Sequence, residues 1–325
     1  MVRLPAIMRG LRFSEHGTPA VLEVTELPVP RPGPGEVLLR VQAAGINPVD
    51  VATVAIPLPF VEGLHLPAVP GWDVAGTVVM LGPQASGFGV GDEVFGLSRF
   101  PRLGHGTFAE YTTVPVADLA AKPPALPWEQ AGALPLVSLT VLQAFDAAGG
   151  IKPGTRVLIE AAAGGVGHVA AQIAKVAGAT VIGTASGPRH DFLRRVGVDE
   201  PIDYTATEDV FAAAAPVHGA LLSTTAAAAA RAAAAVEPGG FLVSISPQLT
   251  DEIAAVADDR GVRHAAILVT ADGQGMVQVA DLVAEGKLSA QVAHVFPLDR
   301  AVEAFEQVRS RHTAGKVVLA PHSVQ

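Results

Sequence analysis

The chain has 325 residues, enough for about two domains, and it contains no cysteine. Half of its residues are hydrophobic, a content that excludes an intrinsically disordered protein. The formal net charge of −9 disfavours nucleic acid and anionic membranes as partners, and the missing thiols exclude disulfides and cysteine-bound metals. The most apolar stretch, residues 131–145, is shorter than the roughly 20 residues of a membrane-spanning helix. We therefore expect a soluble, cytoplasmic α/β protein.

The first part of the chain is rich in proline and glycine. Short β-type runs, at residues 36–41, 75–80, 92–95 and 108–114, are separated by turn signals such as residues 28–35 and 87–91. Many short strands with this punctuation predict a barrel-like β unit.

After residue 127 the pattern changes to alternating strands and helices. Apolar residues 166, 169, 170, 173, 174 and 177 mark one face of a helix, and the alanine runs 226–230 and 232–235 predict another. Such alternation with short connections predicts a doubly wound parallel sheet. The predicted strands are residues 155–159, 180–184, 200–204, 219–223, 241–246 and 264–270. A tail follows with two helices, ending near Gly286 and Arg309, and a last strand at residues 316–319.

The segment 157–167 joins a buried strand to a helix through a glycine-rich turn. A pyrophosphate approaches a backbone closely only where side chains are missing, and a helix start offers free N–H groups. Gly164 would admit the phosphate and Gly167 would allow close packing of the helix on the strand. Ala162 replaces the first glycine of the dinucleotide pattern G-x-G-x-x-G.

The tip of the second strand of this unit indicates which dinucleotide binds. NAD-binding folds place an acid about 20 residues after the glycines, on the ribose 2′-hydroxyl. Here residues 184–189 read TASGPR, with no carboxylate before Asp191. A hydroxyl and a guanidinium suit a 2′-phosphate, so the sequence favours NADP(H).

Seven blocks, taken together, resemble a known family. They are residues 44–50 (AGINPVD), 70–76 (PGWDVAG), 91–96 (GDEVFG), 106–111 (GTFAEY), 161–167 (AAAGGVG), 202–204 (IDY) and 315–319 (GKVVL). In this order and spacing, from about Met8 to Leu319, the chain resembles a zinc-independent medium-chain dehydrogenase/reductase of the quinone oxidoreductase type.

The resemblance implies a GroES-like β-barrel catalytic domain and a doubly wound, parallel-sheet Rossmann domain. We assign residues 1–123 and 273–325 to the catalytic domain, built from both chain ends, and residues 124–272 to the NADP-binding domain. Relatives of this kind join two sheets through the last Rossmann strand. Since residues 264–270 form an apolar edge strand here, we expect a homodimer.

The resemblance also assigns cofactor-binding residues. At the pyrophosphate we expect Ala163, Gly164, Gly165, Val166 and Gly167. At the 2′-phosphate and its ribose we expect Ser186, Arg189 and Tyr204. At the nicotinamide side we expect Ser244, Ile245, Ser246, Ile267, Leu268 and Val269.

Three further residues are candidates for the catalytic site. Asn47, the only asparagine of the chain, and Thr140 are expected beside the nicotinamide ring. A turn residue before Pro48 is an equally simple interpretation of Asn47. Asp50 would orient a substrate or cap a helix. The apolar segment 51–66 is interpreted as a loop that either lines a hydrophobic substrate cleft, which is the favoured interpretation, or packs on the barrel.

Two departures from relatives bear on metal and substrate. Zinc-dependent relatives have a cysteine before the position of Asp50 and a His-Glu pair after that of Gly71, where this chain has Trp72 and Asp73. None of its ten histidines has zinc-helix spacing, so we expect no metal. Ala52 stands where close quinone reductases often have tyrosine, which leaves a roomier pocket.

The predicted function is NADPH-dependent hydride transfer to a quinone or an α,β-unsaturated carbonyl, without zinc. The expected partner is a small hydrophobic carbonyl compound. Two alternatives remain open: an enoyl-thioester or alkenal reductase with the same chemistry, and a non-catalytic NADPH-binding sensor. Turnover of NADPH with a panel of acceptors separates them.

Overall fold

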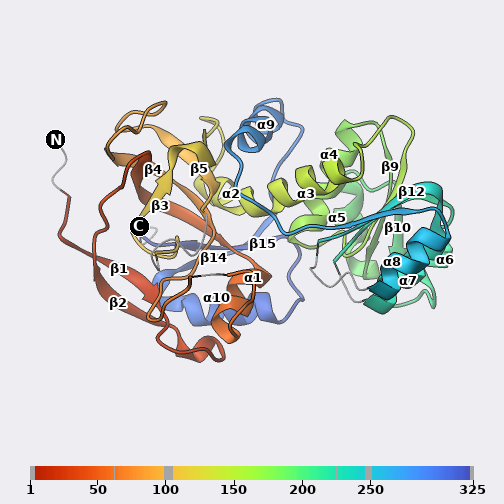
Figure 1. Cartoon of the computed structure of the whole chain (residues 1–325), viewed down its shortest axis with the longest axis horizontal. Coiled ribbons are helices and arrows are strands. Elements are labelled where there is room, and N and C mark those ends of the chain that lie inside the picture. Colours follow the sequence, from red (N-terminus) through yellow and green to blue (C-terminus); the bar gives the residue numbers. More distant parts are fainter. Residues whose placement is uncertain (1–3, 62, 99–104, 224–225, 246–250, 323–325) are drawn as a thin grey trace. The chain divides into compact units, whose positions relative to one another are not determined.

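The chain forms two compact units in a computed structural model that describes residues 4–61, 63–98, 105–223, 226–245 and 251–322. One unit combines residues 1–136 with 270–325, and the other comprises residues 137–269 (Figure 1). The domain boundaries expected from the sequence, after residues 123 and 272, stay predictions.

The first unit is built on a sheet that is antiparallel except for one pair of strands. Its order is β14-β15-β3-β4-β5-β7, with β6 also paired to β3, and only β14 and β15 run parallel. Phe108 and Phe305, both fully buried, meet edge to face in its core at a centroid distance of 5.7 Å. The strands of this sheet are β3 (Glu36–Ile46), β4 (Asp73–Leu81), β5 (Glu93–Leu97), β6 (Tyr111–Pro115), β7 (Leu119–Ala121), β14 (Val292–Pro297) and β15 (Lys316–Ala320). Strands β1 (Ile7–Arg12) and β2 (Glu23–Pro28) pair with each other in a separate antiparallel sheet. The helices are α1 (Pro48–Ala55), α2 (Trp128–Ala133), α9 (Gly273–Ala284) and α10 (Ala301–Arg309), with 3-10 turns η1 (Pro19–Val21), η2 (Val116–Asp118) and η4 (Leu298–Arg300).

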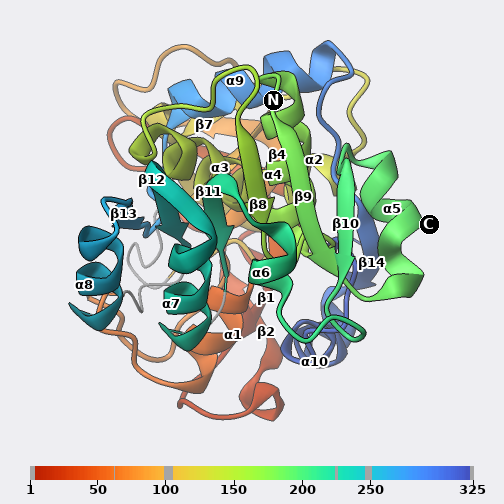
Figure 2. The ribbon, with the colours of Figure 1, turned by 90° about the vertical axis from the view of Figure 1, so that its right-hand side faces the viewer.

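The second unit is a six-stranded parallel sheet in the order β10-β9-β8-β11-β12-β13. The strands are β8 (Arg156–Ile159), β9 (Thr180–Ala185), β10 (Glu200–Asp203), β11 (Val217–Leu222), β12 (Val236–Ser244) and β13 (Arg263–Ala266). Helices α6 (Val210–Ala214), α7 (Ala226–Ala235) and α8 (Asp251–Asp259) lie together on one face of the sheet (Figure 2). Helices α4 (Gly165–Val176) and α5 (His190–Arg195) pack on strands β8 to β10. The remaining elements are α3 (Pro135–Ala147), which leads into the unit, and the 3-10 turn η3 (Gly187–Arg189).

This architecture confirms the predicted fold class. The order of the second sheet is that of a doubly wound nucleotide-binding fold, in which the strand order reverses between the parallel strands β8 and β11. A parallel sheet covered on both faces needs apolar strands, and Val157, Leu158 and Ile159 are fully buried. The alanine runs form a helix, as predicted, and Ala229, Ala232 and Ala233 are buried in its core.

Two predicted elements were wrong. The segment 51–66 does not begin as a loop, because α1 continues to Ala55 after starting at Pro48, a residue that suits the first turn of a helix. The strand predicted at residues 264–270 ends at Ala266. Its partner β12 ends opposite, at Ser244, so no strand within the described residues continues the ladder.

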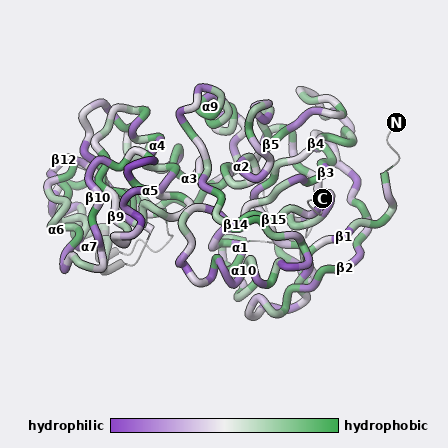
Figure 3. Tube along the Cα trace, turned by 180° about the vertical axis from the view of Figure 1, so that it is seen from behind, coloured by the Kyte–Doolittle hydropathy of each residue, from purple (hydrophilic) through white to green (hydrophobic). Residues whose placement is uncertain are grey.

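Hydrophilic and hydrophobic segments alternate along the trace of both units (Figure 3). Within the described residues, no helix is both long and apolar enough to cross a membrane.

Candidate functional site

The predicted cofactor-binding residues gather at one edge of the second sheet. Because all its strands are parallel, their carboxyl ends meet at this edge. The glycine turn follows β8, Ser186 follows β9, Tyr204 follows β10 and Ile267 follows β13. Ligands of such sheets bind outside the carboxyl ends, where the strand order reverses. The structure thus brings these residues to the edge where a dinucleotide is expected.

The glycine turn is shaped for a phosphate. Ala161 lies in the left-handed region, with φ of 51°, and its carbonyl accepts a 2.8 Å hydrogen bond from the Gly164 amide. A methyl group added to Gly164 would meet only that carbonyl oxygen within 4 Å, at 3.2 Å, apart from its chain neighbours. At Gly167 it would come within 2.4 Å of the same oxygen. Gly164 therefore leaves open space at the start of α4, whereas Gly167 lets the helix pack on the turn.

A second glycine explains why Ala162 can replace the first glycine of the pattern. A methyl group built on Gly183, in β9, would lie only 2.8 Å from the Ala162 Cβ. The glycine in the neighbouring strand therefore leaves the space that the Ala162 methyl group occupies. Thr184 completes the support: its hydroxyl accepts from the Ala161 amide at 3.0 Å and its carbonyl from the Ala162 amide at 2.9 Å. The sequence reasoning did not identify this role of Thr184.

The buried side chain of His168 contacts the same turn through a hydrogen bond. Its side chain is fully buried, and its Nδ1 lies 2.8 Å from the Gly164 carbonyl oxygen. The amides of residues 165–167 come before the first hydrogen bond of the α4 ladder, from the His168 amide to the Gly164 carbonyl. A helix start of this kind is suited to an anion, and the residues present fit a pyrophosphate.

The tip of β9 presents the residues expected around a 2′-phosphate. Ser186 precedes the short turn η3, Arg189 ends it, and Tyr204 is 56% exposed at the end of β10. An acid that the sequence analysis did not consider lies here as well. Asp203 accepts hydrogen bonds from the Gly187 amide and from the Thr205 amide and hydroxyl, which lower its pKa.

The residues expected at the nicotinamide side lie at the ends of β12 and β13. Ser244 is nearly buried, and its carbonyl accepts a 2.8 Å hydrogen bond from the Ile267 amide. The Ile245 amide donates to the Leu222 carbonyl at 2.9 Å. Leu268 is exposed and Val269 half-buried, while Ser246 lies outside the described residues.

In the first unit, Asn47 and Asp50 lie together at the start of α1. Asp50 Oδ2 accepts a 2.7 Å hydrogen bond from the Asn47 amide, so the carboxyl group caps the helix. A role of Asp50 towards substrate stays a prediction. Thr140 belongs to the second unit, where it is buried on α3.

Asn47 belongs to a buried polar network that the sequence did not reveal. The ammonium group of Lys316 donates to the Asn47 Oδ1, to the Ile46 carbonyl at 3.2 Å and to Asp73 Oδ2 at 3.2 Å. The Asn47 Nδ2 donates to the same Asp73 oxygen at 2.8 Å. The Leu136 amide donates to the other oxygen at 2.6 Å. The side chains of Lys316 and Asp73 are 3% and 0% exposed.

The sheet register assembles this network. Val317 pairs with Ile46, so Lys316 begins β15 beside the end of β3, and Asp73 begins β4 on the other side. A methyl group on Gly45 would come within 2.6 Å of the Asp73 carboxylate, which makes a glycine necessary there.

Burial changes the protonation of the two acids in this region. Desolvation raises the pKa of Asp50 to about 8, with Asp73 nearby adding to the shift, and Asp50 Oδ1 has no partner among the described residues. Desolvation also raises the pKa of Asp73, but Lys316 and the hydrogen bonds from Asn47 and Leu136 oppose that shift.

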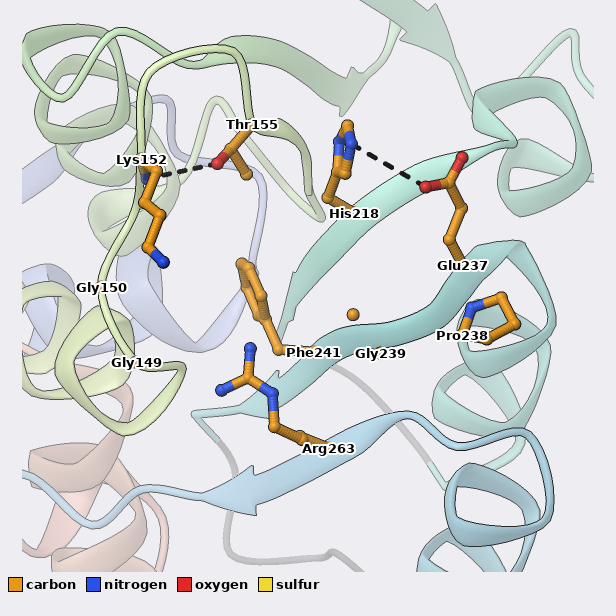
Figure 4. Close-up of a pocket in the computed structure, with 11 residues that line it drawn as sticks. Gly149, Gly150, Lys152, Thr155, His218, Glu237, Pro238, Gly239, Phe241 and Arg263 are labelled. Carbon is orange, nitrogen blue, oxygen red and sulfur yellow. Dashed lines mark hydrogen bonds and ion pairs between the residues drawn. The ribbon is translucent and has the colours of Figure 1, made fainter.

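A pocket of about 520 Å³ lies elsewhere, where the strands of the second unit begin (Figure 4). Arg263 starts β13 there and donates to the Ala148 carbonyl at 2.6 Å, while His218 accepts from the Arg156 amide at 2.9 Å. Because Thr155 precedes β8 and the glycine turn follows it, this pocket occupies the edge opposite to the expected cofactor site.

The fold defines a class: a two-unit protein whose second unit is a parallel sheet of the nucleotide-binding type. Comparisons with known proteins agree. Residues 33–124 match the model of the alcohol dehydrogenase GroES-like domain, and residues 196–319 match that of a zinc-binding dehydrogenase domain. The chain belongs to the medium-chain dehydrogenase/reductase superfamily and is quinone oxidoreductase-like, as the sequence motifs predicted. Membership implies a nicotinamide cofactor.

Individual relatives cover nearly the whole chain. It is 30% identical to a chloroplast envelope quinone oxidoreductase homolog of Arabidopsis thaliana, over 97% of this chain and 99% of the relative. It is 31% identical to the 2-methylene-furan-3-one reductase of Solanum lycopersicum, over 98% and 81%. Among solved structures, the quinone oxidoreductase from Coxiella burnetii superposes with a TM-score of 0.91 at 32% identity, over 97% of this chain and 100% of that one. An NAD-dependent alcohol dehydrogenase superposes with a TM-score of 0.86 at 34% identity, over 97% and 100%.

No group of three or more histidine, aspartate or glutamate side chains is placed to hold a metal ion in the described part of the chain.

Proposed function

We propose that this protein uses NADPH to reduce a quinone or an α,β-unsaturated carbonyl compound, without zinc. The names of the relatives support the substrate class, since one is a quinone oxidoreductase homolog and another reduces a methylene-furanone.

One observation carries the zinc-independent chemistry: the ammonium group of Lys316 binds Asn47 and Asp73. Asp73 replaces the glutamate of the His-Glu pair of zinc-dependent relatives, and Trp72 replaces the histidine. A fixed positive charge among these groups repels a second cation, and the three acceptors around Lys316 are already engaged.

Arg189 supports the choice of NADPH over NADH. A guanidinium group makes charge-assisted hydrogen bonds to phosphate, and Arg189 ends the turn that follows β9. The carboxylate of Asp203 lies against the same turn and opposes an anion there, so we expect a moderate preference rather than an exclusive one.

Different residues would bind different parts of the cofactor and the substrate. The turn at Gly164 would hold the pyrophosphate, Ser186, Arg189 and Tyr204 the adenosine end, and Asn47 would hold a carbonyl group by hydrogen bonding. When bound, NADPH supplies a hydride, and one proton from water completes the two-electron reduction of the acceptor. A conjugated acceptor spreads the developing charge, so it needs little acid catalysis.

The test is consumption of NADPH, followed at the nicotinamide absorbance, with 1,4-benzoquinone, methyl vinyl ketone and crotonyl-CoA as acceptors. We expect turnover with the quinone or the enone, unchanged after treatment with a zinc chelator. Turnover with crotonyl-CoA alone would favour an enoyl-thioester reductase. NADPH binding without turnover would favour a non-catalytic sensor, and loss of activity with the chelator would overturn zinc independence.

We further propose a homodimer in the cytosol. Strand β13 lies at the edge of its sheet, where it can pair with a second copy. Light scattering that finds only a monomer at micromolar concentration would contradict the dimer.

A further inference from the structure

We propose that Lys316 and Asp73 are positioning residues that fix the side-chain amide of Asn47 in one orientation for reduction of the substrate. The proposal rests on the function proposed above, but its central claim, a fixed amide, can be measured without turnover.

Charge decides which way the amide faces. Lysine can only donate hydrogen bonds, and an ionised aspartate can only accept them. Asn47 Oδ1 accepts from Lys316, and Nδ2 donates to Asp73 at 2.8 Å. The flipped amide would place its N–H groups against an ammonium group and its oxygen against a carboxylate. Only one of the two orientations is therefore compatible with both neighbours.

The other partners of the pair leave it little freedom to move. Lys316 also donates to the Ile46 carbonyl at 3.2 Å, and Asp73 also accepts from the Leu136 amide at 2.6 Å. The backbone of Asn47 is held in addition by Asp50, at 2.7 Å. Both the backbone and the amide plane of Asn47 are thus fixed by groups that are themselves anchored.

Stability alone is a weak explanation for this arrangement. A buried ion pair recovers in attraction roughly what it loses in hydration, and an apolar pair of similar size often stabilises a protein as well. A positioning role explains why two charges are retained around a neutral amide. Among the residues that the structure describes, one N–H of Asn47 has only the Gly45 carbonyl as an acceptor, at the long distance of 3.4 Å, and this is the donor that remains for a substrate carbonyl.

The chain offers a direct readout, because Asn47 is its only asparagine. Protein labelled with ¹⁵N in the asparagine side chain gives one NH₂ signal pair in a proton–nitrogen NMR spectrum. In the wild type we expect two well-separated proton frequencies and slow exchange with water. Nearly equal, rapidly exchanging protons in the wild type would overturn the proposal without any variant.

The variant for this test is Lys316→Met combined with Asp73→Leu, which removes both charges, leaves neither one buried alone and keeps Asn47 the only asparagine of the chain. We expect its Asn47 signals to move towards those of free asparagine and to exchange faster. The control is Lys175→Met, which breaks an exposed ion pair with Asp199 at 3.0 Å and should leave these signals unchanged. Unaltered Asn47 signals in the paired variant would contradict the proposal.

Activity then tests whether the pair acts through Asn47. We expect the paired variant to lower kcat at least tenfold and to change the Kd for NADPH less than twofold. In an Asn47→Ala background, the same two substitutions should change kcat less than twofold. An equal loss of kcat in both backgrounds would show that Lys316 and Asp73 act independently of Asn47. If the wild type reduces no acceptor, the proposed function fails, while the NMR result still decides whether the amide is fixed.

Discussion

The protein handles charge differently in its two units. In the first unit, Asp73 and Lys316 are buried. The Asp73 carboxylate accepts hydrogen bonds from the Lys316 ammonium group and from the Asn47 amide. At the carboxyl edge of the second unit, Arg189 is half-buried and Tyr204 is mostly exposed. In the first site the protein itself pairs the two charges, whereas in the second a ligand could reach the mostly exposed Tyr204.

This difference determines what a substitution does. Buried charges interact through a medium of low dielectric constant, so removing one leaves the other unpaired and destabilises the fold. Exposed charges are screened by water and salt, so their removal changes affinity and leaves stability nearly unaltered. Four predictions test this contrast, from the largest expected effect to the smallest.

Lys316→Met should lower the free energy of unfolding by about 3–5 kcal/mol, because it leaves the Asp73 carboxylate buried without its cation. Urea unfolding measures this change. Adding Asp73→Asn should recover at least half of the loss, since the second charge is then gone as well. A single variant as stable as the wild type would show that the buried pair behaves like an exposed one.

Asp50→Asn should remove a pH dependence of stability. The folded state holds the pKa of Asp50 at about 8, against 3.8 for the unperturbed group, so between these values unfolding releases a proton. Stability therefore falls as pH rises through this window, by at most about 1.4 kcal/mol per pH unit. Urea unfolding at pH 5, 6, 7 and 8 should show a shallower decline for the variant. Parallel curves would mean that Asp50 is ionised in the folded protein.

Arg189→Ala should weaken NADPH binding by about thirtyfold, since a charge-assisted hydrogen bond contributes roughly 2 kcal/mol. NADH binding should hardly change, because NADH lacks the 2′-phosphate. Titration of both cofactors into wild type and variant measures the two affinities, with unfolding in urea as the control for stability. Equal weakening of both cofactors would mean that this turn is no phosphate site.

Asp203→Asn should have the smallest effect, a tightening of NADPH binding by no more than about fivefold, as for one charge near the surface. Asparagine can keep the hydrogen bonds from Thr205, so the turn should persist. The gain should shrink as salt is added, because exposed charges are screened. A gain that is independent of salt, or a loss of affinity, would contradict a repulsive role for this carboxylate.

Local patterns in the sequence predicted much of the second unit. The glycine turn, its strand and its helix are contiguous, so the pattern of residues 157–176 alone predicts the strand–turn–helix unit. Asp203 was missed because the search for an acid was limited to the tip of the second predicted strand, whereas Asp203 ends the neighbouring strand and pairs with Ala185. The order of strands in the sheet decides which strand ends lie side by side, and that order could not be read from the sequence.

The first unit was harder to predict because its site joins distant parts of the chain. Lys316 is 269 residues from Asn47, and only the pairing of β15 with β3 brings them together. One signal was available in the sequence: Lys316 begins the apolar run KVVLA. If that strand is buried, the lysine charge is buried too and needs an acid or other hydrogen-bond acceptor beside it. The helix α1 was missed because residues 51–66 were interpreted as a loop, although the preceding Pro48 favours the first turn of a helix.

The placement of Lys316 also affects how the protein is made. Residues 137–269 form a unit that is complete in the growing chain before the first unit can close. At about 5–20 residues per second, translation from residue 136 to residue 316 takes roughly 10–40 s. During that interval Asp73 has no ammonium partner, so we expect the early segment to stay open while the inserted unit folds. Limited proteolysis of ribosome-bound chains stalled near residue 312, which leaves residues 137–269 outside the exit tunnel, should therefore cut residues 1–136 and spare residues 137–269.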